Sequence, residues 1–426
     1  MSSVYIFGTL TARALLRSGT EGRLLFSCAL VVLLVPITNV VGLLFTGMEH
    51  SLQVFLALVI LLGLVHERET AVIPWWLSVA IVMGPLVRYE NLALSLPALA
   101  CLALRRHVWA LILCTSALAI TIVGFSLFLS SLGLGILPSS VLAKSTVAAN
   151  GGVGAMASNL IQNLWTRQGA LLSLGLLLLL SSAVNKRRFA GDRLLAGWAG
   201  IALVLHFVCG RFGWYARYEM YVWTTTLLAL IYLFGEELVR LQDSVSGSRA
   251  VTAVLLCGVA IGWPYASTLI TTPLASRNIY EQQYQMHRFI SQYWRGPVAA
   301  NDLGWTSYRN DNYVLDLRGL ASREALQAQE NTDPAWMDQL AKRHHVGLAM
   351  IYRESFKGIP NQWVLVGELH LGSPRITPFS STVAFYALDS AALERARALA
   401  TDFRNSLPNG VTFTLKIAPN LRAPLH

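Results

Sequence analysis

Residues 84–99, GPLVRYENLALSLPAL, place an arginine and a glutamate two positions apart inside an apolar run. Charged side chains are costly in the middle of a bilayer, so Arg88 and Glu90 are expected at a turn rather than in mid-span. We therefore predict that this run divides into two short helices, which meet at an outer turn carrying Arg88 and Glu90.

The rest of the chain repeats this apolar character. Of its 426 residues, 54% are hydrophobic and only 13% are charged. Several apolar runs approach the length of about 20 residues that an α-helix needs to cross a bilayer. The composition indicates a mainly α, polytopic transmembrane protein. The candidate runs are 24–45, 51–65, 71–87, 91–104, 108–136, 168–184, 194–210, 218–235 and 250–269.

These runs define a domain organisation. We predict an N-terminal cytoplasmic segment at 1–23 and a transmembrane domain at 24–270 of about eight or nine helices, some of them short for a full crossing. From 277 onward the polarity rises, and a third region, 277–426, follows.

Basic residues predict the orientation. If all the runs span and the N-terminus starts in the cytoplasm, cytoplasmic segments hold twelve Lys and Arg residues and the opposite loops hold five. The net charge of +10 is explained by this asymmetry, and nucleic acid is not an expected partner. The cytoplasmic set is Arg13, Arg17, Arg23, Arg68, Arg105, Arg106, Lys186, Arg187, Arg188, Arg193, Arg240 and Arg249. The outer set is Arg88, Lys144, Arg167, Arg211 and Arg217.

The region 277–426 reads as a small α/β domain. NIYEQQYQMHRFISQYW (278–294) is an amphipathic helix candidate, and β-rich runs alternate with helix-like PAWMDQLAKRHH and SAALERARALATDFRNSL. The β-rich runs are YVLDL, VGLAMIY, WVLVGEL and VAFYAL. Nine crossings from a cytoplasmic start would place this domain outside the cytoplasm.

Ionisable residues gather in the predicted outer loops. The loops contain TGMEHS (46–51), LVRYEN (86–91), LPSSVLAKS (137–145) and ARYEMY (216–221). Ionisable groups that converge at a membrane boundary indicate a functional cavity, whereas the alternative is that they cap helix ends and extend to the interface. Lys144 is suited to hold a phosphate as a point charge, although a solvated loop lysine is the alternative.

These motifs, together with NDLGWTSYRNDNYVLDLRGL (301–320), resemble those of GT-C superfamily glycosyltransferases, polytopic enzymes that use polyprenyl-phosphate sugars. The similarity is closest to the bacterial branch of arabinofuranosyltransferase-like enzymes, and it extends from 46 to about 320. It implies a GT-C-type helical bundle with an extracytoplasmic α/β domain in the bacterial inner (plasma) membrane. The implied reaction moves a sugar from a polyprenyl-phosphate donor to a cell-envelope glycan or lipid acceptor.

The resemblance also implies roles for individual residues. Arg88, Lys144 and Arg217 would balance the charge of the donor phosphate. Glu90 would orient Arg88 or bind sugar hydroxyls, although Tyr89 departs from the proline found at this place in the family. Tyr215, Tyr218 and Trp214 would stack on sugar or prenyl surfaces, with an aromatic membrane belt as the alternative.

The carboxylate that should remove the acceptor proton is not evident. In this superfamily it is an aspartate in the first outer loop, but the first aspartate of this chain is Asp192, in a predicted cytoplasmic loop. Three explanations are open: an N-terminally shortened transferase, Glu49 or Glu90 as the base of a divergent site, or a non-catalytic membrane protein that binds or transports lipid-linked glycans.

Other chemistry is weakly indicated. All the cysteines lie in apolar segments, so neither a disulfide framework nor a zinc site is expected. The adjacent histidines of AKRHHVG (341–347) point apart and favour no metal site. Asp302 and Asp316 fit turn caps at strand ends better than acids near the acceptor. No cofactor is predicted, and a requirement for a divalent cation stays open.

Overall fold

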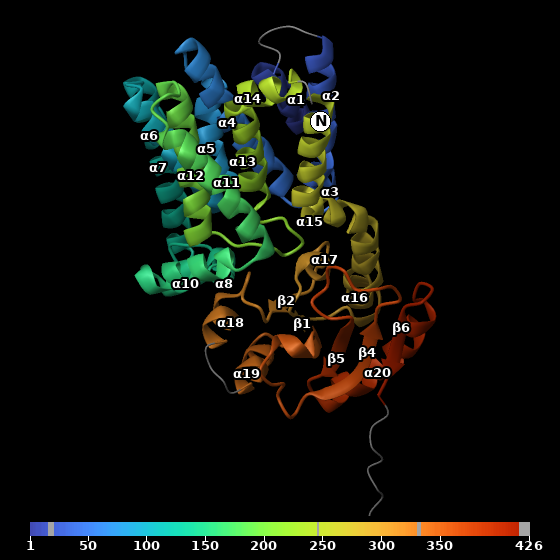
Figure 1. Ribbon diagram of the computed structural model, residues 1–426. Helices are drawn as coiled ribbons and strands as arrows, with labels where there is room; N and C mark the ends of the chain where they lie inside the picture. Colours follow the sequence, from blue (N-terminus) through green and yellow to red (C-terminus); the bar gives the residue numbers. More distant parts are fainter. Residues whose placement is uncertain (16–20, 245–246, 330–333, 417–426) are drawn as a thin grey trace, which may run out of the picture. The chain divides into compact units, whose positions relative to one another are not determined.

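A computed structural model describes residues 1–15, 21–244, 247–329 and 334–416 of the chain (Figure 1). The chain divides into two compact units. Unit 1 comprises Met1–Leu132 and Ser145–Ile270, and unit 2 comprises Gly133–Lys144 and Thr271–His426. Unit 2 thus contains the residues of the predicted 277–426 domain together with 271–276 and a piece of the long loop that begins near Leu132.

Unit 1 is built from helices. In chain order they are α1 (Ser2–Leu15), α2 (Glu21–Ile37), α3 (Val40–Leu44), α4 (His50–Thr70), α5 (Trp75–Val87), the 3₁₀ turn η2 (Tyr89–Asn91), α6 (Leu92–Leu104), α7 (Val108–Ser131), α9 (Thr146–Asn150), α10 (Gly152–Leu164), α11 (Arg167–Val184), α12 (Ala190–Cys209), α13 (Met220–Leu233), α14 (Gly235–Gln242) and α15 (Gly247–Glu281), whose last residues belong to unit 2.

Within the described residues, five helices are long and apolar enough to cross a membrane: α4, α7, α11, α12 and the helix that starts at Gly247. The pair α13 and α14, bent by 62°, would form a sixth. Shorter apolar helices cover Leu24–Ile37, Trp75–Val87 and Tyr89–Leu104. The predicted short run at 51–65 lies inside α4, which is longer, at 21 residues, because it continues through polar residues at its C-terminal end.

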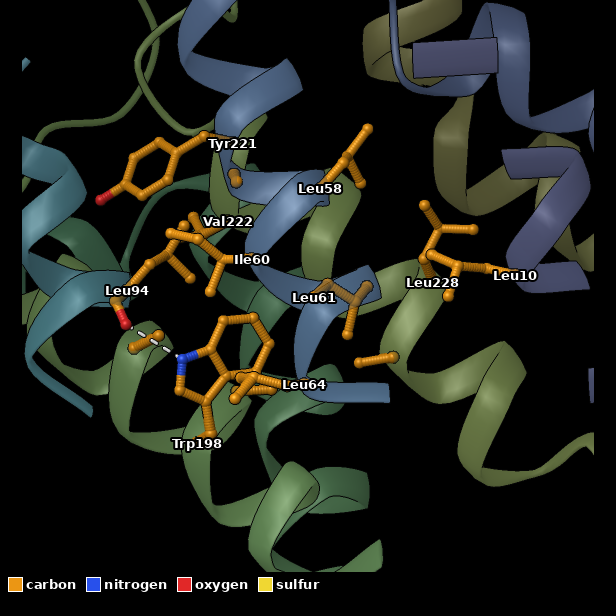
Figure 2. Packing of buried hydrophobic residues seen from close by; sticks show 14 of the residues in the cluster. Leu10, Leu58, Ile60, Leu61, Leu64, Leu94, Trp198, Tyr221, Val222 and Leu228 are labelled. Carbon is orange, nitrogen blue, oxygen red and sulfur yellow. Dashed lines mark hydrogen bonds between the residues drawn. The ribbon is translucent and has the colours of Figure 1, made fainter. Parts of the chain in front are cut away.

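Helix α4 packs at the centre of unit 1. Leu58, Ile60 and Leu61 are completely buried, and the neighbouring Trp198 of α12 donates its indole N–H to the carbonyl of Leu94, 3.0 Å away (Figure 2). On another face, Gly63 lets α5 approach closely, because a Cβ atom at this position would lie 2.8 Å from Cβ of Leu77.

Ion pairs gather at the C-terminal end of α4. Glu67 pairs with Arg105 and His107, both at 3.0 Å, and Arg68 pairs with Asp192 at 2.7 Å. Arg68 lies in the last turn of α4, and Arg105 and His107 lie between α6 and α7 at the same end of unit 1. At 1.5 Å per residue, the 21 residues of α4 separate this end from Glu49 by about 30 Å, which is the thickness of a bilayer's hydrocarbon core.

Unit 2 contains a six-stranded mixed sheet of order β2-β1-β3-β5-β4-β6. β2, β1 and β3 run parallel, whereas β3–β5, β5–β4 and β4–β6 are antiparallel. The four predicted β-rich runs coincide, to within one residue at an end, with β2 (Val314–Asp316), β3 (Leu348–Ile351), β4 (Val364–His370) and β5 (Thr382–Ala387), or enclose them. Sequence patterns missed β1 (Val298–Ala300) and β6 (Thr412–Leu415), which are short.

Helices cover both faces of this sheet. One face packs against α16 (Gln283–Arg288), the π-helical segment Phe289–Trp294 and α20 (Ser390–Asn405). The other packs against α18 (Arg323–Ala328) and α19 (Ala335–Arg343). Unit 2 also holds α8 (Ser139–Lys144) and α17 (Gly304–Ser307). The helices α19 and α20 lie where the sequence predicted them.

Asp316 has the turn-capping role expected from its position. Its Oδ1 accepts the backbone N–H of Arg318 at 2.8 Å and its Oδ2 accepts that of Ala321 at 2.7 Å. His344 stacks on the ring of Tyr313, with centroids 4.6 Å apart. The described residues contain no group of three or more His, Cys, Asp or Glu side chains that could hold a metal ion.

Candidate functional site

The break between α5 and α6 lies where the sequence predicted it. Helix α5 ends at Val87, Arg88 is extended (φ −152°, ψ 132°), and the 3₁₀ turn Tyr89–Asn91 leads into α6. The backbone N–H of Arg88 still bonds to the carbonyl of Gly84 at 3.0 Å. The charged pair therefore lies at a helix junction and not within a continuous span.

Arg88 lies between two carboxylates. Its Nη1 bonds to Oε1 of Glu49, which immediately precedes α4, and its Nη2 bonds to Oε1 of Glu90 at 2.6 Å. The Arg88 side chain is only 9% exposed, whereas those of Glu49 and Glu90 are 41% and 35% exposed. Burial alone would lower the pKa of the Arg88 guanidinium, but the two carboxylates outweigh it and raise this pKa. Both ends of the guanidinium fork are therefore occupied.

Tyr218 joins Arg88 to a second cation. The guanidinium carbon of Arg88 lies 5.6 Å from the Tyr218 ring centroid, and that of Arg217 lies 5.2 Å from it. The His50 ring contacts the same tyrosine, with centroids 5.7 Å apart. Both arginines are thus within the range of cation–π attraction to one ring.

Arg217 has weaker partners than Arg88. Its Nη1 lies 2.9 Å from Sδ of Met48, its Nη2 lies 3.5 Å from the Tyr218 hydroxyl, and its buried Nε has no hydrogen-bond partner. No ion pair joins Arg217 to an acidic side chain in the described part of the chain. A thioether is a weak acceptor, so the charge of Arg217 is not balanced by a carboxylate.

The loop before α13 holds Arg217 in place through an unusual backbone. Gly213, Trp214, Tyr215 and Ala216 all have positive φ, at 86°, 49°, 65° and 50°. Non-glycine residues rarely adopt this region, and consecutive examples persist only where surrounding contacts fix them. Such strain is concentrated at functional sites in other proteins.

Glu219 supplies one of those contacts. Its Oε2 accepts the backbone N–H of Gly213 at 3.0 Å, while its Oε1 is buried without a hydrogen-bond partner. The residue is completely buried, and burial raises the pKa of its carboxyl to about 7 against the opposing backbone N–H groups. The buried Glu219 side chain therefore stabilises the left-handed loop by accepting the backbone N–H of Gly213.

Helix α10 is fixed to the same end of unit 1. Asn159 donates to the carbonyls of Val208 and Gly210 at 2.9 and 2.8 Å, and Asn163 donates to that of Phe207 at 2.8 Å. These amides satisfy carbonyls at the C-terminal end of α12, which have no partners within the helix.

Two of the predicted binding residues, Tyr215 and Lys144, are not among the contacts described for Arg88. The Tyr215 hydroxyl donates to the carbonyl of Thr268 on α15 at 2.6 Å, so this residue anchors the loop. Lys144 is the last residue of α8 and belongs to unit 2. The residues that the structure does bring together are Glu49, Arg88, Glu90, Arg217 and Tyr218, which we call the arginine cluster.

Sequence reasoning did not assign the supporting residues Met48, His50 and Glu219. The first two lie in TGMEHS, beside Glu49, and Glu219 lies in ARYEMY, beside Tyr218. Their place in the same motifs is the only signal in the sequence. The contacts of Met48 with Arg217 and of His50 with Tyr218 join segments more than 150 residues apart, whereas Glu219 bonds to the nearby Gly213.

Comparison with known proteins adds one match. A family described as a domain of unknown function (DUF8728) matches residues 277–386, which lie in unit 2 and run from the end of α15 into β5. No curated protein and no solved structure matches the chain.

Proposed function

We propose that this chain is a multi-pass membrane protein that binds a polyprenyl-phosphate sugar at the arginine cluster and, as a GT-C-type transferase, passes the sugar to a cell-envelope glycan or lipid acceptor. The observation that supports the proposal most is Arg217, a half-buried guanidinium with no carboxylate partner in the described residues. A phosphate diester offers the anion that this guanidinium lacks.

The arrangement suits a leaving group that gains charge. As the bond between the sugar and phosphate breaks, negative charge grows on the phosphate, and a fixed cation stabilises it most where water is partly excluded. Arg217 has this role in the proposal. Arg88, neutralised by Glu49 and Glu90, positions Tyr218, whose ring also contacts Arg217.

The location of the cluster agrees with a lipid-linked donor. It lies about 30 Å from the ion pairs around Glu67, so an apolar bundle separates two polar ends. We propose that the cluster end faces outward across the bacterial inner membrane, since the opposite end carries Arg13, Arg68 and Arg105. In this orientation the prenyl chain remains in lipid while the phosphate reaches Arg217.

A non-catalytic binder of lipid-linked glycans is the second candidate. Both candidate bases, Glu49 and Glu90, are bonded to Arg88. Burial would raise the pKa of Glu49, but its own backbone N–H and the charge of Arg88 outweigh burial and lower it, which makes Glu49 a weaker proton acceptor. The pairing of both candidate bases with Arg88 therefore favours binding of the lipid-linked glycan without sugar transfer.

Binding can be measured on the full chain in nanodiscs with polyprenyl phosphate as the probe. Arg217→Gln is expected to weaken binding about tenfold or more, because a charge-assisted hydrogen bond contributes roughly 1.5–3 kcal/mol. Arg167→Gln removes an exposed cation from the predicted outer set and serves as the matched control. Equal affinities for the two variants would contradict the proposal.

A transfer assay separates the two candidates. Polyprenyl-phosphate pentose and hexose donors are incubated with the full chain and oligosaccharide acceptors, and the labelled products are counted. Transfer that Arg217→Gln abolishes supports the enzyme, whereas binding without any transfer supports the non-catalytic candidate.

A further inference from the structure

Unit 2 carries a cluster of aromatic side chains outside its core. Tyr280 of α15 stacks on Tyr284 of α16, with ring centroids 5.5 Å apart. Trp305 of α17 meets Tyr284 edge-on at 5.1 Å, contacts His287 at 5.8 Å and meets Tyr308 at 5.4 Å. We call these five residues the aromatic platform.

The platform is exposed to a degree that packing does not explain. Tyr280 is 51% exposed, Trp305 is 37% exposed and Tyr308 is 50% exposed. Single exposed aromatic residues are ordinary, but a contiguous group of them in one domain indicates a contact surface for a ligand, a partner or a membrane.

Polar groups without partners lie at the same helix. Gln283, only 4% exposed, donates its amide to Asp302 at 3.1 Å and to the Tyr352 hydroxyl at 2.9 Å, yet its Oε1 has no hydrogen-bond partner. Nδ1 of His287, four residues further along α16, is also buried without one. Residues i and i+4 lie on one side of a helix, next to Tyr284. A buried polar atom left without a hydrogen-bond partner is unfavourable for the folded state.

These groups favour a sugar over a lipid as the occupant. Acyl chains can cover aromatic rings but cannot supply hydrogen bonds to an amide oxygen or an imidazole nitrogen. A sugar ring has both an apolar C–H face, which packs on an aromatic ring, and hydroxyl groups, which can donate to Gln283 Oε1. Ligand sites commonly combine aromatic walls with a few such polar groups.

We infer that the aromatic platform, with Gln283 beside it, binds a neutral oligosaccharide and so provides the acceptor-glycan site of unit 2. Only the assignment of this oligosaccharide as the acceptor rests on the proposed function. Binding of sugar by the platform can be measured without any transfer. The platform lies entirely within residues 277–386, the segment that matches the family DUF8728.

The test uses the full chain in nanodiscs and a panel of neutral arabino-, manno- and gluco-oligosaccharides immobilised on beads. Trp305→Ala and Tyr308→Ala are expected to reduce retention on at least one oligosaccharide about tenfold. Tyr313→Ala is the matched control, because Tyr313 is an exposed aromatic residue of unit 2, at 44%, that stacks on His344 outside the platform. Equal retention of all three variants, or no retention of the unaltered chain, would overturn the inference.

A second measurement tests the membrane alternative. A fluorophore on Tyr308→Cys, in a chain whose native cysteines are replaced by alanine, is placed in nanodiscs containing brominated lipids. The inference predicts fluorescence that the brominated lipids leave unchanged, whereas strong quenching would assign the platform to the membrane interface and overturn it.

The two proposals fail in different ways. If Arg217→Gln loses phosphate binding while Trp305→Ala retains oligosaccharide as the unaltered chain does, the sugar-binding role of the platform is rejected and the role of the arginine cluster is kept. The reverse pattern keeps a sugar-binding unit 2 and removes the proposed polyprenyl-phosphate site.

Discussion

Arg88 and Arg217 contact the same tyrosine but differ in charge balance. Arg88 is nearly buried and bonded to two carboxylates, whereas Arg217 has a thioether, a phenol and no carboxylate in the described residues. Arg88, which stands out in the sequence, is therefore the arginine whose charge the protein itself neutralises. This difference shifts the candidate phosphate contact from Arg88 to Arg217.

Glu219 allows a prediction about pH. Its pKa is raised from an ordinary value of 4.5 to about 7, so between these values the unfolded chain is ionised while the folded chain keeps the proton. Stability should then fall as pH rises from 4.5 to 7, by about 3 kcal/mol at most, and level off above 7. Thermal unfolding in detergent measures this slope.

Variants isolate the contribution of Glu219. Glu219→Gln should remove most of the fall in stability between pH 4.5 and 7. Glu236→Gln, at an exposed position on α14, should leave it intact. If the unaltered chain and Glu219→Gln show the same pH slope, Glu219 is not protonated in the folded protein.

At the scale of elements, close packing of α4 against α5 brings Glu49 near Arg88. The missing side chain at Gly63 permits this approach, since an added Cβ would lie 2.8 Å from Cβ of Leu77. Gly63→Ala should therefore lower stability by about 1 kcal/mol net, because overpacking outweighs the better helix propensity of alanine. Gly197→Ala on α12, where an added Cβ would have no atom of another element within 4 Å, should raise the unfolding temperature or leave it unchanged. Similar shifts in both variants would contradict the role of Gly63.

The sequence patterns found those elements whose signals are local. The apolar runs, the break at Arg88 and the helices α19 and α20 were predictable because periodicity and charge act over a few residues. The ion pair between Arg88 and Glu49 was not, because it joins positions 39 residues apart and depends on helix packing. β1 was missed because its three residues are all buried and show no alternation. The left-handed run at 213–216 has only one glycine to signal it.

At the scale of the molecule, unit 1 has two polar ends with opposite roles. The end with Glu67, Arg68 and Arg105 is closed by ion pairs, whereas at the other end Arg217 has no carboxylate partner among the residues that the structure describes. This asymmetry is the basis of the proposed orientation, in which unit 1 is anchored at one membrane face and binds an anion at the other.

Labelling with a membrane-impermeant thiol reagent on intact cells tests this orientation. Ser158→Cys on α10, at the cluster end, should react from outside, and Arg187→Cys, at an exposed position after α11, should not. Both are made in a chain with Cys28, Cys101, Cys114, Cys209 and Cys257 replaced by alanine. The opposite labelling pattern would place the cluster in the cytoplasm and remove access to an outer acceptor.

The most direct test of the account compares the affinity for polyprenyl phosphate of the unaltered chain, Arg217→Gln and Glu49→Gln. If Arg217 holds the phosphate while Glu49 neutralises Arg88, Arg217→Gln weakens binding about tenfold or more, and Glu49→Gln, which leaves Arg88 with one carboxylate, strengthens it. Undiminished binding by Arg217→Gln, or weaker binding by Glu49→Gln, would contradict the account.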